Sequence, residues 1–368
     1  MSNQKIVRYN LDVLEKENCD FNLIIGEKGN GKSYQVKHKR GVLKYLLQNN
    51  RRFIYLRRLR EEISTEKVEQ YFADVDVQKI TNGKYNCITM YKKQLFLSNY
   101  DFENSKTVRG EKIGYVMALS TEQNYSGCSY LDVDDIIFEE FMSRTEYLYN
   151  EPNKLMYLYS TVDRKQRRVK VWMLGNTVSR VCPYVQEWGL DNIIFSMKQG
   201  TIEKIDIPTD SVDVNGNEVF IKLGIEYCKS TGVSSFVFGN AKNLINKGGW
   251  QADPQPTLPK SLNEYKSVFR FMFYYQSFKF LCRYLWDKTE NVYCWFICPY
   301  YGTIDDRTLV VTDKVSPSRY WVGDIYNTRF PNERINNLLK TFVESKIFYS
   351  TDLCGTEFKR LINFMIKK

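Results

Sequence analysis

An eight-residue segment near the N-terminus constrains this chain more than any other feature. It fits the phosphate-binding pattern G-x-x-x-x-G-K-S/T, the P-loop, with the residues Gly26, Glu27, Lys28, Gly29, Asn30, Gly31, Lys32 and Ser33. A short apolar run precedes it at residues 21–25, and residues 34–47 carry apolar side chains at helical spacing after it. Because a strand and a helix flank the pattern, we predict a nucleotide-binding site.

The residue types in this segment each have a physical reason to be there. Glycines let the backbone turn tightly, so that its N–H groups and the start of the next helix point at phosphate oxygens. Lys32 can then reach the β- and γ-phosphates, and the Ser33 hydroxyl can ligate Mg²⁺. The guanine-recognition pattern N-K-x-D is absent from the sequence. We therefore expect all eight residues to bind ATP, together with Mg²⁺.

A second motif lies at residues 134–141, where a buried apolar strand ends in two acids. This pattern is typical of Walker B, in which the first acid holds the Mg²⁺ shell and the second polarises the attacking water. The first acid, usually Asp, is Glu139 in this chain, and the second is Glu140. The extra methylene of Glu139 would move its carboxylate, which leaves the geometry of the metal site open. The alternative is that both acids only cap a strand end.

The segment between the two motifs, residues 34–133, is long and contains strand-like runs. It leaves space for a strand inserted between the two motif strands. Together with Glu140, this spacing indicates an α/β fold of the additional-strand, catalytic-glutamate class of P-loop ATPases.

Polar and basic residues follow the second motif. Residues 169–176 read as a strand ending in Asn176, whose amide can bind the γ-phosphate or the attacking water. Arg164, Arg167 and Arg168 lie in a basic cluster that could supply an arginine finger to a neighbouring subunit, or form a solvated helix end. The arginines beside the strand at residues 51–58 leave a similar choice between binding phosphate or DNA and solvation.

The 368 residues divide into three predicted parts. Residues 1–208 form the ATPase domain, and turn signals such as Asn215-Gly216 place a linker at residues 209–253. Residues 254–368 form a strand-rich α+β domain with 17 Lys and Arg against 11 Asp and Glu. The net charge of +10 favours nucleic acid as the partner. No constellation of acids suggests the two-metal chemistry of a nuclease.

Other classes of protein fit poorly. Nine scattered cysteines without a C-x-x-C pair, and a single histidine, argue against a zinc site and for reduced thiols inside a cell. The apolar windows are too short or too charged to cross a bilayer, so no membrane partner is expected.

These motifs in this order resemble the DNA-packaging ATPases of phi29-like tailed bacteriophages, which are terminase-like motors. The resemblance covers the first part of the chain by motif and the remainder only by the order of its elements. It rests on residues 21–33, 53–58, 136–141, 161–176 and 183–184.

The resemblance implies a homo-oligomeric ring of five subunits, docked on a procapsid portal in the host cytoplasm, that moves double-stranded DNA by ATP hydrolysis. A structural packaging RNA is left open as a further partner. Glu139 would take the metal-binding position, Glu140 the catalytic one, Arg164 that of the trans-acting arginine finger, and Asn176 the polar strand end. The second domain would resemble an RNase H-like nuclease that lacks its catalytic acids.

Two alternatives remain at this point. The chain could be a P-loop ATPase that remodels nucleic acid without a capsid. It could also be a nucleic-acid assembly protein whose bound nucleotide is scarcely hydrolysed, and Glu139 in place of Asp keeps that hypothesis open.

Overall fold

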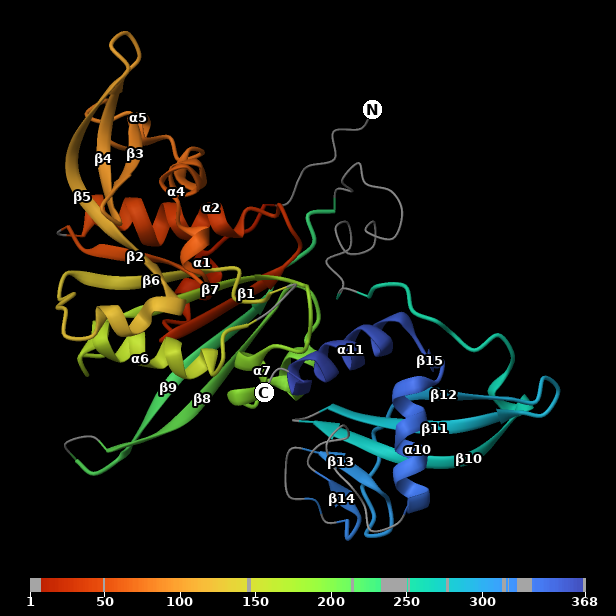
Figure 1. Cartoon of the computed structure of the whole chain (residues 1–368). Coiled ribbons are helices and arrows are strands. Elements are labelled where there is room, and N and C mark those ends of the chain that lie inside the picture. The colour runs from red at the N-terminus through yellow and green to blue at the C-terminus, as the bar shows by residue number, and fades with distance from the viewer. Residues whose placement is uncertain are drawn as a thin grey trace. The chain divides into compact units, whose positions relative to one another are not determined.

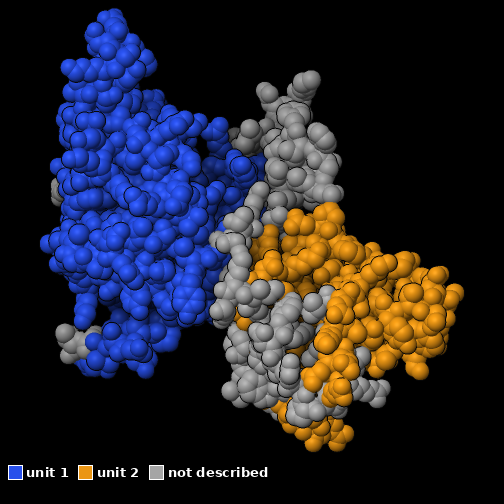
Figure 2. Space-filling model, in the orientation of Figure 1, with its two compact units in different colours: residues 1–178, 182–249 blue, residues 179–181, 250–368 orange. Residues whose placement is uncertain are grey.

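The computed structural model describes residues 8–48, 50–143, 147–212, 215–232, 250, 252–275, 278–312, 316, 318–322 and 333–366. The chain divides into two compact units, residues 1–178 with 182–249 and residues 179–181 with 250–368 (Figure 2). Each unit contains one β-sheet, of nine and six strands respectively among the described residues.

The sheet of the first unit has the strand order β3-β4-β5-β2-β6-β7-β1-β9-β8. From β5 to β9 every neighbouring pair is parallel, while β3, β4 and β8 add antiparallel strands at the two edges. The bounds are β1 (Phe21–Gly26), β2 (Arg52–Arg57), β3 (Cys87–Tyr91), β4 (Gln94–Asp101), β5 (Lys106–Ala118), β6 (Val133–Glu139), β7 (Lys170–Asn176), β8 (Thr201–Val212) and β9 (Glu218–Tyr227).

Helices cover both faces of this sheet (Figure 1). Every residue of β1 is buried, as expected for a parallel strand covered on both sides. On one face a single apolar cluster joins the strands to the helices that surround the P-loop. These are α1 (Asp12–Lys16), α2 (Lys32–Val36), which continues through the π-helical segment Lys37–Leu43 into α3 (Lys44–Leu47), α4 (Thr65–Phe72) and α5 (Val77–Ile80). On the other face lies α6 (Glu151–Asp163), followed in the chain by α7 (Pro183–Glu187) and α8 (Asp191–Ser196).

The strand–loop–helix unit, the strand before the two acids and the strand ending in Asn176 are confirmed as β1 with α2, β6 and β7. One strand does lie between the two motif strands, as predicted, but its origin differs. It is β7, which follows the second motif in sequence, because β7 pairs with β1 on one side and β6 on the other. The strands at residues 87–118 extend the far edge of the sheet instead.

The predicted linker at residues 209–253 is wrong in its first part. Strand β8 runs to Val212, and β9 (Glu218–Tyr227) pairs in parallel with β1, so both belong to the sheet of the first unit. The predicted turn at Asn215-Gly216 connects them as a hairpin. The first unit therefore extends past residue 208, the predicted end of the first domain. Residues 233–249 lie outside the described residues.

Asp135 on β6 connects the helix after the P-loop to the sheet. Its side chain is fully buried and accepts hydrogen bonds from Arg40 at 2.8 and 2.9 Å and from the indole of Trp172 on β7 at 2.8 Å. Lys44 pairs with its other oxygen. A buried carboxylate with this many charged and polar donors is well compensated, and it fixes the helix on β6 and β7.

The second unit has the strand order β14-β13-β10-β11-β12-β15. Strands β10 to β12 are antiparallel, and the shorter strands add to both sides in parallel. Its core is aromatic, with Phe271, Phe342 and Trp295 packed edge to face. The bounds are β10 (Tyr265–Tyr275), β11 (Phe278–Asp287), β12 (Val292–Pro299), β13 (Val310–Thr312), β14 (Trp321–Val322), β15 (Ile347–Tyr349), α10 (Glu333–Glu344) and α11 (Asp352–Ile366).

This mixed sheet with two C-terminal helices agrees with the α+β domain expected from residue 254 onward. Within the described ranges no helix combines the length and the apolar character needed to cross a membrane.

We predict that Asp135→Ala lowers the free energy of unfolding by about 3–5 kcal/mol, because the largely buried Arg40 and Lys44 would lose the carboxylate they share and keep only Glu15 at 2.6 Å and Asp134 at 3.9 Å. Asp132→Ala is the matched control: Asp132 pairs with Arg52 at the surface, and its loss should cost less than about 1 kcal/mol. Urea unfolding of the two variants and the wild type measures both values. Equal losses would contradict the role given to Asp135.

Candidate nucleotide-binding and catalytic site

The carboxyl ends of three parallel strands bring the predicted motifs together. In the register of β1 and β7, Gly26 lies opposite Asn176, and in that of β6 and β7, Glu139 lies opposite Leu174. The first residue of the P-loop, the polar strand end and the first Walker B acid therefore share one edge of the sheet. Ligands of open parallel sheets bind at this carboxyl edge.

The P-loop has the backbone conformation that its glycines predict. Gly29 and Gly31 have φ angles of +83° and +93°, in the left-handed region that favours glycine. A Cβ at either position would meet no atom within 4 Å, so a side chain there would be strained by the backbone conformation and not by a clash. Gly31 is the last residue before α2, whose first residues are Lys32 and Ser33. This loop conformation before a helix start suits a phosphate group.

The Lys32 side chain is buried, and its ammonium group is already hydrogen-bonded. It donates to the backbone oxygen of Glu27 at 2.9 Å and to the side-chain oxygen of Asn176 at 2.8 Å. Burial lowers the pKa of Lys32, and the neighbouring carboxylates of Glu139, Glu27 and Glu140 oppose that shift. The ammonium group therefore lies among the predicted catalytic acids, where an anionic phosphate would stabilise its charge.

Two other P-loop side chains hold the loop in place. The Glu27 carboxylate accepts hydrogen bonds from the Ser230 hydroxyl at 3.2 Å and from the backbone of Thr231. The side-chain oxygen of Asn30 accepts the N–H of Lys32 at 3.1 Å, and its backbone oxygen accepts that of Tyr9 at 2.9 Å. Both side chains are buried, whereas Lys28 is exposed. Because these side-chain oxygens already accept hydrogen bonds within the protein, we expect Glu27 and Asn30 to contact the nucleotide through their backbone groups.

Ser33, the last residue of the P-loop, and Glu139 bring a hydroxyl oxygen and a carboxylate oxygen close together. The Ser33 hydroxyl lies 3.2 Å from Glu139 Oε2, and the Tyr71 hydroxyl donates to Glu139 Oε1 at 2.6 Å. Burial raises the pKa of Glu139, while the hydrogen bonds from Tyr71 and Ser33 lower it. Hydroxyl and carboxylate oxygens are the ligands that Mg²⁺ prefers, so the two predicted metal residues fit this ion.

Glu140 is more exposed than Glu139 and has a strained backbone. Its φ of +58° lies in the left-handed region, which is uncommon for a side chain of this kind and concentrated at functional sites. Arg57, the last residue of β2, donates to Glu140 Oε2 at 2.9 Å. The strand β6 thus ends at Glu139, directly before this residue, and Arg57 holds the Glu140 carboxylate.

Arg58 directly follows β2 and is one of the arginines that could either bind phosphate or DNA or be solvated. Its guanidinium is buried and makes two hydrogen bonds to the fully buried Glu151, at 2.8 and 3.0 Å, and one to the Phe141 carbonyl at 2.7 Å. Arg58 is neither solvated nor open to DNA. It fixes the chain just after the Walker B acids to the first turn of α6.

Arg164 lies away from these residues. It ends α6 with a φ of +51° and donates to the carbonyl of Cys128 at 2.9 Å, ahead of the first residue of β6. That position is at the amino edge of the sheet, opposite the carboxyl edge with Lys32 and Glu139. The structure therefore brings together the predicted metal, phosphate and Walker B residues but not Arg164.

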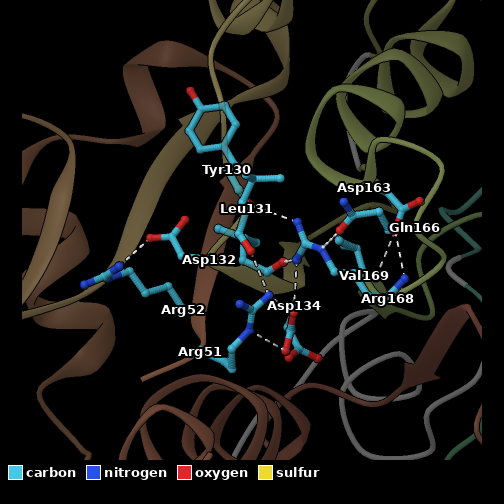
Figure 3. A network of polar contacts seen from close by, with 12 residues as sticks. Arg51, Arg52, Tyr130, Leu131, Asp132, Asp134, Asp163, Gln166, Arg168 and Val169 are labelled. Atoms are coloured by element: carbon cyan, nitrogen blue, oxygen red, sulfur yellow. Dashed lines mark hydrogen bonds and ion pairs between the residues drawn. The ribbon is translucent and has the colours of Figure 1, made fainter. Parts of the chain in front are cut away.

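Arg168, a neighbour of Arg164 in the same cluster, has a structural role (Figure 3). It donates to Asp134 at 3.0 Å, a carboxylate that Arg51 also binds, and to the carbonyl of Tyr130 at 3.1 Å. The Asp163 carboxylate accepts three backbone N–H groups of the following loop. This network fixes the loop after α6 to the start of β6, while Arg164 stays exposed beside it.

The first unit, which holds these residues, also matches a known family. The model of the family described as Podovirus DNA encapsidation protein (Gp16) matches residues 3–249, about two thirds of the chain. The chain belongs to this family.

Two relatives of this DNA encapsidation family member are DNA packaging proteins. The one from Bacillus phage B103 is 30% identical over 173 residues, 46% of this chain and 48% of the relative. The one from Bacillus phage phi29 is 30% identical over 167 residues, 45% of each chain. The chain thus spans about half the length of these curated relatives. A chain of the bacteriophage Phi-29 viral genome packaging motor assembly has the same fold, with a TM-score of 0.54, 20% identity and coverage of 98% of this chain and 99% of that chain.

Two contacts of the predicted acids, from Tyr71 and from Arg57, were not predicted from the sequence. Tyr71 belongs to no motif and is 68 positions from Glu139, so only the packing of α4 on the sheet reveals the contact. Arg57 was noted as an arginine at a strand end, but its partner Glu140 is 83 positions away. Both contacts depend on which strands are neighbours, because β2 lies next to β6.

We predict that Gly31→Ala weakens ATP binding about 5- to 30-fold, since a left-handed non-glycine residue costs about 1–2 kcal/mol and the loop can relieve it only by changing shape. Gly83→Ala is the matched control, with a φ of +81° and equally open surroundings outside the loop. Titration with a fluorescent ATP analogue measures affinity, and thermal unfolding measures the strain. Equal affinities for the two variants would contradict the predicted phosphate cradle.

Proposed function

We propose that the chain is an ATP-driven motor that translocates double-stranded viral DNA into a preformed procapsid, as a homo-oligomeric ring at the portal. Membership of the DNA encapsidation family and the DNA packaging proteins among its relatives support this. One observation carries the proposal: Lys32, Ser33 and Glu139 meet at one edge of the sheet while Arg164 lies at the opposite edge. A site divided in this way needs a second copy to become complete.

We assign the first unit to the additional-strand, catalytic-glutamate class of P-loop ATPases. The position of β7 between β1 and β6 supports the assignment, as does the second acid at the end of β6. In this class Glu140 orients and polarises the water that attacks the γ-phosphate. Its strained backbone and exposed carboxylate suit a group that must reach beyond the strand end.

The other residues would bind and orient the nucleotide. Lys32 exchanges its bonds to Glu27 and Asn176 for the β- and γ-phosphates, which frees the Asn176 amide to contact the γ-phosphate or the water. Ser33 and Glu139 hold Mg²⁺, which when bound neutralises charge developing on the phosphates. Arg164 reaches the ATP of the adjacent subunit, where a guanidinium stabilises the transition-state charge.

The remaining parts of the proposal concern DNA and assembly. The net charge of +10 suits contacts with phosphate groups, which are sequence-independent and weaken with salt. We infer five subunits per ring, docking at the portal in the host cytoplasm, and leave a structural packaging RNA as a further partner.

We relate the second unit to RNase H-like nucleases without nuclease activity. Two of its acids support this, because both serve turns. Asp287 binds Lys260 and the turn after β11, and Asp305 binds the Arg307 N–H and the Thr308 hydroxyl. Neither carboxylate is left to hold one of the metal ions that two-metal hydrolysis requires.

We expect ATP hydrolysis per subunit to rise with protein concentration and further with double-stranded DNA. The reason is that Arg164 can complete a site only in a neighbouring copy. Steady-state phosphate release at several protein concentrations, with and without DNA, tests this. A rate that ignores both variables would overturn the ring-motor proposal, while dependence on DNA alone would favour a nucleic-acid-remodelling ATPase.

We predict that Glu140→Gln and Arg164→Ala each abolish turnover while leaving ATP binding intact, and that mixing them restores part of the rate. In the mixture some interfaces pair an intact Glu140 with an intact Arg164 from the other variant. Arg167→Ala is the control for loss of an exposed basic residue, and should keep its turnover. A mixture as inactive as its components would show that Arg164 does not act between subunits.

A further inference from the structure

The carboxylate of Glu139 is held from two sides by side chains of different helices. The Ser33 hydroxyl of α2 lies 3.2 Å from one oxygen, and the Tyr71 hydroxyl of α4 lies 2.6 Å from the other. Only 6% of the Glu139 residue surface is exposed. The two oxygens therefore have different partners: Oε2 faces the P-loop, and Oε1 faces away from it toward Tyr71.

Tyr71 is itself firmly placed. Its ring stacks on Tyr55 of β2 with centroids 4.6 Å apart and meets Phe72 edge to face at 4.9 Å. The ammonium group of Lys37 lies 4.3 Å from the ring centroid and pairs with Asp74 at 2.5 Å. The hydroxyl thus projects from an immobilised ring toward a fixed point, the outer oxygen of Glu139.

We propose that Tyr71 is a positioning residue that adapts the longer Glu139 side chain to the metal site. A Walker B acid is usually Asp, and glutamate has one more rotatable bond, so its carboxylate has more orientations to lose on binding a metal. The bond from Tyr71 removes that freedom in advance and presents Oε2 beside the Ser33 hydroxyl. The inference rests on the proposed ATPase function, because it needs Mg²⁺ at Ser33 and Glu139.

A double-mutant cycle between Tyr71→Phe and Glu139→Asp tests this role. Tyr71→Phe keeps the ring packing and removes only the hydroxyl. The measurement is the affinity for a fluorescent, non-hydrolysable ATP analogue over a Mg²⁺ titration and again in EDTA. It reports metal and nucleotide binding without requiring turnover.

We expect Tyr71→Phe to raise the Mg²⁺ concentration for half-maximal binding by about tenfold, as for a lost hydrogen bond to a charged group. Affinity in EDTA should stay unchanged. In the Glu139→Asp background the carboxylate is too short to reach the hydroxyl, so adding Tyr71→Phe should change the Mg²⁺ requirement less than about twofold.

Tyr45→Phe is the matched control, because Tyr45 is also buried and donates to a glutamate, Glu111, at 3.1 Å. It should leave the Mg²⁺ requirement at the wild-type value. Equal shifts by Tyr71→Phe in both backgrounds, or an equal loss of affinity in EDTA, would reduce Tyr71 to a packing role and overturn the proposal. Wild-type binding that ignores Mg²⁺ would instead overturn the metal role of Glu139, on which the proposed function depends.

Discussion

The buried carboxylate of Asp135 is the interaction on which the site geometry depends. It joins three elements, since Arg40 and Lys44 come from the helix after the P-loop, Trp172 from β7, and Asp135 itself from β6. The same helix begins with Lys32 and Ser33, and the same strand ends with the Walker B acids. The position of Ser33 beside Glu139 is therefore fixed partly by Asp135, four residues before Glu139 on β6, through ion pairs that are largely buried.

The fold around this interaction was predictable where the signal is local. β1, β6 and β7 are runs of apolar residues that end in a residue suited to phosphate or metal, and parallel pairing then brings those ends together. A strand between β1 and β6 was expected, but it was looked for in residues 34–133 and is formed by β7. The number of residues between the two motifs shows only that the chain is long enough for another strand. Which segment forms that strand depends on crossover direction, which residue patterns do not carry.

The misassigned linker has a different cause. β8 lies at an edge of the sheet, and its residues and the first half of β9 alternate between exposed and half-buried positions, so they look like a polar connection. Asn215-Gly216 between two runs of alternating residues is a strong signal for a β-hairpin. This signal predicts both strands, whereas the overall polarity of the segment favours a linker. The contacts of Tyr71 and Arg57 lie beyond such reasoning, because they arise only when β2 and α4 pack beside β6.

The predicted nucleotide-binding residues and the predicted arginine finger lie at opposite edges of the sheet in a single chain. At the carboxyl edge, the Arg57 guanidinium forms an ion pair with the Glu140 carboxylate, so the charge of Arg57 is already compensated there. At the amino edge, Arg168 is held by Asp134 and backbone carbonyls, while the exposed Arg164 side chain donates to the Cys128 carbonyl. Of the arginine side chains beside α6, that of Arg164 would therefore need the least free energy to move away from its present contact. Arg164 is exposed at one edge of the sheet, while Lys32, Ser33 and Glu139 lie at the other. In the proposed function a head-to-tail contact between identical chains would bring these two edges together, and such contacts form a ring when the rotation between neighbours closes.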